Sequence, residues 1–408
     1  MKIINIEARE VFDSRGLPTV EADVYVDDDV FGRVSIPSGA STGSSEALEL
    51  RDGEERFFGK GVRKAISNIL NIILPNVRDK DFKSQEELDK FLIDLDGTPN
   101  KERLGANSIL AVSIGFLKAC AIKSGKPLYR YIGDNKKMPR CMINILNGGI
   151  HADNDLEIQE FMIMPMRDSI KDQLEVAGNV FQNLKKLLKS KHLSVNVGDE
   201  GGFAPQLKSN EEALDLIVEA IKNASYEPGV DVCLALDVAA CSFYDKEKDK
   251  YLINSNYYDK TEMIDMYRNL IDKYPIISIE DPLHEDDFFG FSSVTNALDI
   301  QIVGDDLFTT NVDRLNKGIS MGACNAILVK ANQIGTVTEM VNAVKLAKAN
   351  NYGVVISHRS GETGDTFLAD MAVGYAIPMI KTGSLSRGER ICKYNRLLRI
   401  EEEINKND

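Results

Sequence analysis

Short apolar runs that stop at a charged residue recur six times in the second half of this 408-residue chain. The runs are residues 232–237, 276–280, 300–305, 326–330, 354–359 and 378–381. From the second run onward they recur at roughly 25-residue intervals, the length of one strand plus one helix. This repeat predicts a (β/α)8 barrel, in which the carboxyl ends of the strands meet at one mouth.

The charged residues that end these runs predict a site at the barrel mouth. They are Asp237, Glu280, Asp305, Lys330, Arg359 and Lys381. One charged residue at a strand end is most often a helix cap or a surface ion-pair partner. Six of them in register around one mouth indicate a functional site instead.

The three acids of this set predict a metal site. Carboxylates aimed at one cavity repel each other and raise each other's pKa unless a cation joins them. Oxygen ligands suit a hard ion, Mg2+ above all. The alternative is a salt-bridge network in which acids and bases pair off, for example Asp305 with Lys330. A lysine close to a second lysine, an arginine and a metal ion would have a lowered pKa, which makes it a candidate general base.

Length, charge and cysteine usage narrow the class of protein. A chain of 408 residues exceeds the size at which one hydrophobic core usually stops growing, so we expect two domains. The net charge of −14 argues against nucleic acid or a membrane surface as a partner. The six cysteines include no C-x-x-C pair, and no apolar run approaches the ~20 residues that span a bilayer. With no signal-peptide core at the N-terminus, we expect a cytoplasmic protein with reduced thiols.

The first third of the chain has a different pattern. Apolar and polar residues alternate over 20–26 and again over 30–36, which predicts an antiparallel hairpin. Helical stretches follow at about 60–74, 84–95 and 105–124. Strands followed by helices predict an α+β domain, and the polar stretch 133–140 is the expected linker. We therefore expect an N-terminal α+β domain over residues 1–137 and a barrel over residues 138–408.

Four loops carry further candidate residues. The segment 37–43, Pro-Ser-Gly-Ala-Ser-Thr-Gly, is small and flexible enough to be a mobile lid. His151 lies on a glycine-rich loop, and Gln159 and Glu160 open an apolar run. Glu200 lies on a glycine turn, where backbone and ligand can approach closely. Each signal is weak alone, since a single loop histidine is more often structural than functional.

Together these motifs resemble one family. In chain order they are Asp13-Ser14-Arg15-Gly16, 37–43, Gly148-Gly149 with His151, Gln159-Glu160-Phe161, Asp199-Glu200-Gly201-Gly202, Glu280-Asp281-Pro282, Gly304-Asp305-Asp306-Leu307, Asn332-Gln333-Ile334-Gly335, Ser357-His358-Arg359-Ser360-Gly361 and Lys381-Thr382-Gly383. The set closely resembles the enolase family (phosphopyruvate hydratases) from about Ile3 to Glu403. The resemblance implies an N-terminal α+β domain, a barrel of ββαα(βα)6 topology, and a homodimer or higher assembly. It also implies the reversible dehydration of 2-phosphoglycerate to phosphoenolpyruvate.

The resemblance also implies metal and acid–base roles. Two Mg2+ ions would bind during turnover, the tighter one at Asp237, Glu280 and Asp305 and the other reached by Ser41 on the lid. Lys330 would be the base that removes the proton next to the substrate carboxylate. Glu200 would be the acid that protonates the departing hydroxyl, with Glu160 as its helper. This fits the superfamily pattern of a lysine or histidine base acting with Mg2+.

The resemblance further implies a set of substrate contacts. These would come from Gln159, His151, His358, Arg359, Ser360 and Lys381. Arg359 and Ser360 match a phosphate site, and Lys381 matches the substrate carboxylate site. His151 would also close over the substrate as part of a lid. Because Arg359 is expected at the mouth and not in the core, we expect it to contribute little to folding.

The sequence departs from the family pattern at a few positions. They are Leu17 in place of Asn, Cys241-Ser242 in place of Ser-Glu, Phe288 in place of Trp and Gly364 in place of Glu. Three alternative functions remain at this stage. They are another reaction of the same superfamily, a Schiff-base aldolase with Lys330 or Lys381 as nucleophile, and a non-catalytic enolase-like binding protein.

Overall fold

The N-terminal domain is built on a three-stranded antiparallel sheet. The computed structural model describes residues 1–27, 29–39 and 43–406. The strands are β1 (Asn5–Phe12), β2 (Pro18–Asp27) and β3 (Val30–Ser35), in that order across the sheet. The predicted hairpin is β2 and β3. The sequence analysis missed β1, which pairs along β2 as an edge strand and buries only Ile6 fully, so its apolar alternation is weak.

Helices cover one face of this sheet. They are α1 (Arg63–Asn68), the π-helical turn η2 (Ile69–Ile73), α2 (Leu74–Val77), α3 (Gln85–Asp96), α4 (Ala106–Lys123) and α5 (Leu128–Ile132), preceded by the 3-10 turn η1 (Arg56–Gly59). The helical stretch predicted over 60–74 is an unbroken run of helical backbone over residues 63–77, with a π-turn in its middle. Among the described residues, α4 alone is long and apolar enough to cross a membrane, and 83% of it is buried inside the fold. It is the core helix of this domain, between the sheet and α3.

The second part of the chain is a closed eight-stranded barrel. Its strands are β4 (Arg140–Asn147), β5 (Glu160–Pro165), β6 (Val232–Asp237), β10 (Ile276–Glu280), β11 (Gln301–Gly304), β12 (Ala326–Val329), β13 (Gly353–Ser357) and β14 (Met379–Lys381). They follow one another around the barrel in chain order, and β14 closes on β4. Only β5 runs antiparallel to its neighbours. All six predicted runs coincide with strands to within two residues.

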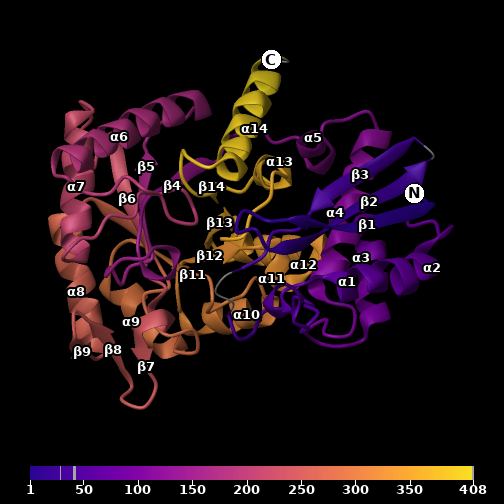
Figure 1. The fold of residues 1–408 in the computed structure, drawn as a ribbon, viewed down its shortest axis with the longest axis horizontal. Helices are drawn as coiled ribbons and strands as arrows, with labels where there is room; N and C mark the ends of the chain where they lie inside the picture. Colours follow the sequence, from indigo (N-terminus) through magenta and orange to yellow (C-terminus); the bar gives the residue numbers. More distant parts are fainter. Residues whose placement is uncertain (28, 40–42, 407–408) are drawn as a thin grey trace.

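Helices and a small sheet lie outside the barrel strands (Figure 1). The helices are α6 (Ile170–Ser190), α7 (Asn210–Asn223), α8 (Lys260–Lys273), α9 (Phe288–Ala297), α10 (Val312–Met321), α11 (Ala331–Ile334), α12 (Val337–Ala349), α13 (Phe367–Gly374) and α14 (Gly388–Asn405). The sheet consists of β7 (Tyr244–Asp245), β8 (Lys250–Ile253) and β9 (Asn256–Tyr258), and 3-10 turns occur at η3 (Gly149–His151) and η4 (Ala240–Phe243). The order is therefore ββαα(βα)6, as expected.

Side-chain alternation along the strands separates the barrel core from the site. An apolar layer fills the inside of the barrel and consists of Met142, Met162, Met164, Cys233, Ala235, Val303, Ala326, Leu328 and Val355. Because side chains on one face of a strand recur every second residue, the next inward position is at the mouth. That position holds Asp237 on β6, Lys330 after β12 and Lys381 on β14. The antiparallel β5 places its first residue, Glu160, at the same mouth, opposite Asp237.

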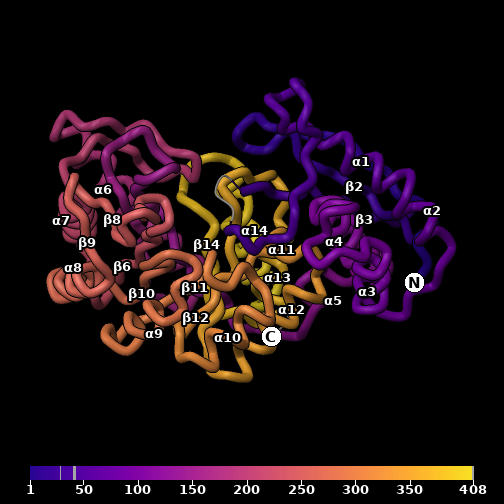
Figure 2. Tube along the Cα trace, turned by 90° about the horizontal axis from the view of Figure 1, so that it is seen from below, coloured from indigo at the N-terminus to yellow at the C-terminus, as the bar shows by residue number. Residues whose placement is uncertain are grey.

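The N-terminal domain lies against the α11–α12 side of the barrel (Figure 2). Side chains on two of its helices accept hydrogen bonds from the start of α12. The backbone N–H of Val337 donates to Ser113 Oγ on α4 at 3.1 Å, and that of Thr338 donates to Asp89 Oδ2 on α3 at 2.8 Å. Between Ile132, where α5 ends, and Arg140, where β4 begins, the chain has no helix or strand. The boundary at residues 137 and 138 stays a prediction.

Candidate active site

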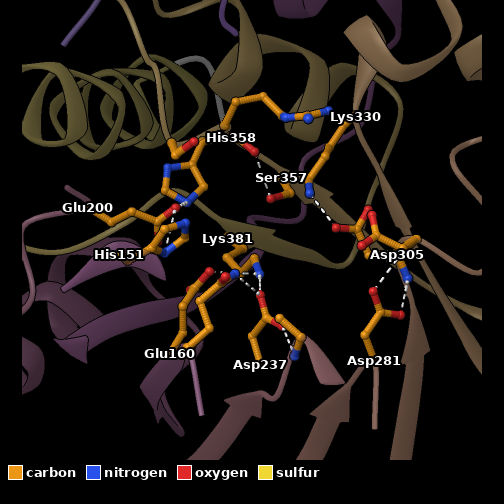
Figure 3. Close-up of a pocket in the computed structure, with 15 residues that line it drawn as sticks. His151, Glu160, Glu200, Asp237, Asp281, Asp305, Lys330, Ser357, His358 and Lys381 are labelled. Carbon is orange, nitrogen blue, oxygen red and sulfur yellow. Dashed lines mark hydrogen bonds and ion pairs between the residues drawn. The ribbon is translucent and has the colours of Figure 1, made fainter. Parts of the chain in front are cut away.

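One pocket at the barrel mouth gathers almost all the predicted site residues (Figure 3). Its cavity volume is about 30 Å3. Its predicted lining residues are His151, Gln159, Glu160, Glu200, Asp237, Asp305, Lys330, His358, Arg359, Ser360 and Lys381. Glu280 does not line it but contacts Lys381 directly. Ser41 lies outside the described residues, so the structure says nothing of it.

Lys381 connects three of the carboxylates. Its Nζ donates to Glu280 Oε2 at 2.7 Å, to Asp237 Oδ2 at 3.0 Å and to Glu160 Oε1 at 3.2 Å. These acids lie together because Glu160 and Glu280 both pair in register with Asp237, from the two neighbouring strands. Burial lowers the pKa of Lys381, but its attraction to the carboxylates outweighs burial and holds the pKa well above its usual value. The lysine is therefore a fixed positive charge.

The carboxylates offer unsatisfied oxygen atoms of the kind a hard cation binds. Glu280 Oε1 and Glu160 Oε2 are buried and have no hydrogen-bond partner among the residues that the structure describes. Burial and the charge of Asp237 raise the pKa of Glu280 well above its usual value. A cation beside Glu280 would relieve both costs. The donor set thus fits Mg2+, and the sequence missed two further acids near it, Asp281 and Asp306, whose carboxylate oxygens lie within 4.8 Å of an Asp305 oxygen.

Asp305 and Lys330 form an ion pair across the mouth. Asp305 also accepts from Gln333 Nε2 at 2.8 Å, and Thr310 Oγ1 accepts from the backbone N–H of Lys330 at 2.9 Å. Burial lowers the pKa of Lys330, but the attraction of Asp305 outweighs burial and the nearby cations, so the pKa is raised. The expectation of a lowered lysine pKa is therefore wrong for the side chains alone. The salt-bridge network considered from the sequence is present at these same residues.

Glu160, Glu200 and two histidines form the other side of the pocket. Glu200 Oε1 lies 3.3 Å from His358 Nε2 and 3.7 Å from His151 Nδ1. Burial acts to raise the pKa of Glu200, but the two histidines hold it well below its usual value. Burial and the charge of Glu200 raise the pKa of Glu160 well above its usual value. The two carboxyls therefore have opposite pKa shifts, and Glu160 is the one of the pair that keeps a proton more readily.

Arg359 is paired with an acid that the sequence analysis did not identify. Its guanidinium donates to the two oxygens of Glu46 at 3.0 and 3.2 Å, and both side chains are buried. Glu46 also accepts from Gln333 Nε2 at 3.3 Å, which connects Arg359 to Asp305. Glu46 lies three residues after the predicted lid, and Gln333 belongs to the Asn332-Gln333-Ile334-Gly335 motif. Because this ion pair is buried, the structure does not support the expectation that Arg359 matters little for folding.

The positions that depart from the family pattern lie outside this pocket. Gly364 has no atom within 4 Å of where a Cβ would stand. Cys241 accepts from the backbone N–H of Glu285 at 3.2 Å, and burial raises the pKa of its thiol. Phe288 is buried, with Lys317 Nζ 3.9 Å from its ring centre.

A closed (β/α)8 barrel with acids, lysines and an arginine at the C-terminal mouth of its strands defines a TIM-barrel enzyme. A profile described as "Enolase, C-terminal TIM barrel domain" matches residues 135–408, and one described as "Enolase, N-terminal domain" matches residues 3–132. An enolase of Methanopyrus kandleri is 51% identical over 410 residues, covering 99% of this chain and 96% of the relative. An enolase of Methanocaldococcus jannaschii is 53% identical over 408 residues, with the same coverage. The chain belongs to the enolase family, a family of lyases.

Proposed function

We propose that this protein is a phosphopyruvate hydratase that carries out the reversible, Mg2+-dependent dehydration of 2-phosphoglycerate to phosphoenolpyruvate. The observation that carries the proposal is the pocket at the barrel mouth, where six acids lie around Lys330, Arg359 and Lys381. A substrate with a phosphate and a carboxylate needs such fixed positive charge. A reaction that moves two protons at different atoms needs separate acids and bases.

The acids Asp237, Glu280 and Asp305 would hold the tighter Mg2+, and Ser41 would reach the second. When bound, Mg2+ would stabilise the negative charge of the intermediate and weaken the hold of Asp305 on the Lys330 proton. The unsatisfied oxygen of Glu280 supports this assignment.

The side chains divide the proton transfers. Lys330 Nζ takes the proton from the carbon next to the substrate carboxylate, and the ammonium of Lys381 stabilises that carboxylate. On the other side, the Glu160 and Glu200 pair delivers one proton to the departing hydroxyl, which leaves as water. The proton is held by Glu160 at rest and passes through Glu200, which is nearer the histidines. Arg359 and Ser360 bind the phosphate, while Gln159, His151 and His358 line the remaining wall.

The alternative functions fit the geometry less well. A Schiff-base aldolase that uses Lys381 needs a neutral amine as nucleophile, whereas three carboxylates hold Lys381 protonated. A non-catalytic binding protein has no need of the charged site residues, and every one that falls in the described residues lies at the mouth. Borohydride trapping with a carbonyl substrate would reveal an aldolase.

We infer a homodimer, which sedimentation velocity tests, and a cytoplasmic location.

The decisive experiment follows phosphoenolpyruvate formation by absorbance, with 2-phosphoglycerate as substrate. We expect turnover with Mg2+, no turnover in EDTA, and recovery when Mg2+ is returned. The melting temperature should fall in EDTA and rise with Mg2+, because a ligand that binds only the folded protein stabilises it. Full activity in chelator would exclude the metal assignment, and absence of turnover with Mg2+ would exclude the proposed reaction.

A further inference from the structure

Arg390, on the C-terminal helix α14, reaches the floor of the pocket from outside the barrel. Its side chain is fully buried. Its guanidinium donates to the backbone carbonyls of Arg359 and Ser360 at 2.6 Å each, and to that of Asp199 at 3.1 Å. These carbonyls belong to the two loops that carry the phosphate-site residues and Glu200. Arg390 therefore connects the two loops through hydrogen bonds to their backbone carbonyls.

The same guanidinium contacts His358. Arg390 NH1 lies 2.6 Å from His358 Nδ1. A guanidinium has only N–H donors and stays charged in proteins, so it cannot accept a hydrogen bond. Nδ1 must therefore be the acceptor of this hydrogen bond. A histidine whose Nδ1 accepts is neutral and carries its one proton on Nε2.

The Nε2 edge of His358 faces Glu200. The distance from Nε2 to Glu200 Oε1 is 3.3 Å. We propose that Arg390 is a positioning residue that fixes His358 as the Nε2–H tautomer, so that a neutral N–H donor lies beside Glu200. The inference rests on the proposed function in one respect, the role of Glu200 in delivering a proton.

The other groups around the two residues agree with this arrangement. Asn144 Nδ2 donates to the second oxygen of Glu200 at 3.1 Å, and His151 Nδ1 lies 3.7 Å from the first. Burial lowers the pKa of His358 to about 4, with Arg390 acting in the same direction and Glu200 and Glu362 against it. His358 thus stays neutral at physiological pH. The consequence for the reaction is that the resting proton of the acid pair is on Glu160, one transfer away from Glu200.

The direct test is the tautomer itself. Full-length protein without substrate is labelled with 15N at its four histidines, His151, His192, His284 and His358, and long-range proton–nitrogen spectra are recorded. The His358 signals are assigned from their loss in His358→Gln. We expect a bare Nδ1 and a protonated Nε2 at neutral pH. A protonated Nδ1, as the other tautomer or as imidazolium, would overturn the inference.

The functional test compares two arginines of α14. Arg390→Lys keeps a positive charge but loses the planar guanidinium that donates several hydrogen bonds at once. The control Arg396→Lys changes an arginine of the same helix that pairs with Asp370, away from the pocket. We expect Arg390→Lys to give mixed His358 tautomers and a kcat lowered about tenfold or more, with KM changed less than about twofold. Arg396→Lys should keep the wild-type spectrum and kcat. The positioning role is wrong if Arg390→Lys keeps the wild-type His358 spectrum, whether its kcat is lowered or not.

The two hypotheses fail in different ways. Wild-type protein that turns over 2-phosphoglycerate but shows a protonated Nδ1 overturns only this inference. The expected tautomer in a protein without turnover supports the Arg390 contact and overturns the proposed function. If Arg390→Lys does not fold, the wild-type spectrum still decides the tautomer.

Discussion

The two lysines and the arginine of the pocket each pair with one or more acids. Lys381 balances three carboxylates, Lys330 pairs with Asp305, and Arg359 pairs with Glu46. Pairs of titratable groups with opposite pKa shifts are the usual basis for separate acid and base roles. Glu160 and Glu200 are such a pair, and Lys330 lies in a different part of the mouth. The two proton transfers can therefore be separated by mutation.

Lys330→Ala should abolish exchange of the substrate α proton with solvent, because no base remains at that carbon. Glu200→Gln should block net dehydration yet keep this exchange, because Lys330 is intact. Exchange is measured by NMR in deuterated buffer, and dehydration by absorbance. Wild-type exchange rates in both variants would show that the roles are assigned wrongly.

Packing between elements depends on two glycines in the N-terminal domain. A Cβ on Gly32 of β3 would lie 2.0 Å from the carbonyl oxygen of Gly115 on α4. Such an approach to backbone atoms cannot be relieved by a side-chain rotation. The strand and the helix must therefore separate if Gly32 gains a methyl group.

Gly32→Ala should lower the free energy of unfolding by about 3 kcal/mol, the upper end of the usual overpacking cost. The matched control is Gly178→Ala in α6, where nothing lies within 4 Å of the added atom. There the stability should rise by about 0.5–1 kcal/mol, because alanine favours the helix. Both are measured by urea unfolding. Equal effects at the two glycines would contradict the packing argument.

Asp89 of α3 caps the start of α12 from the other domain. It accepts from the Thr338 backbone N–H at 2.8 Å and from Thr338 Oγ1 at 2.6 Å. Burial nevertheless raises its pKa from 3.8 to about 6. The unfolded chain then loses this proton at lower pH than the folded chain does. The contribution of Asp89 to stability is therefore full below about pH 4 and is lost as the pH rises to about 6.

Asp89→Asn should remove this pH dependence, since Asn keeps the acceptor and does not ionise. The free energy of unfolding of the variant, relative to wild type, should rise between pH 4 and pH 7 by on the order of 3 kcal/mol. Urea unfolding at the two pH values measures the difference. If the free energy of unfolding of Asp89→Asn relative to wild type is the same at pH 4 and pH 7, Asp89 has an ordinary pKa in the folded protein.

Across the whole molecule, the Arg359–Glu46 pair joins the two domains at the site. The residues are 313 positions apart in the sequence, and both side chains are buried. Removing one partner of a buried ion pair leaves an uncompensated charge. Arg359 is therefore both a proposed phosphate ligand and a contact between domains.

Arg359→Ala should lower the free energy of unfolding by about 3 kcal/mol as well as weaken substrate binding. The double variant Glu46→Gln with Arg359→Met should lose less stability, because no buried charge is left alone. Arg268→Ala, which breaks an exposed pair with Asp265, should change little. Chemical unfolding and KM are measured for each. A single variant as stable as wild type would mean that Glu46 finds other compensation.

The sequence alone determined the fold class and the position of the site. Strand–helix alternation sets the barrel, and apolar runs that stop at a charged residue place Asp237, Lys330 and Lys381 at its mouth. Those patterns are local, so they can be read without the fold. The edge strand β1 was missed because its apolar alternation is weak.

Only the tertiary structure decided which acid pairs with which lysine or arginine at the barrel mouth. Lys381 could have been paired with a metal site or with any of the acids, and strand register selects three of them. Glu46, Gln333 and Arg390 contact the site from segments that have no charged strand end to mark them. Their roles come from contacts between residues far apart in the sequence. Such contacts also set the pKa of Lys330, because the attraction of Asp305 outweighs the repulsion of the neighbouring cations.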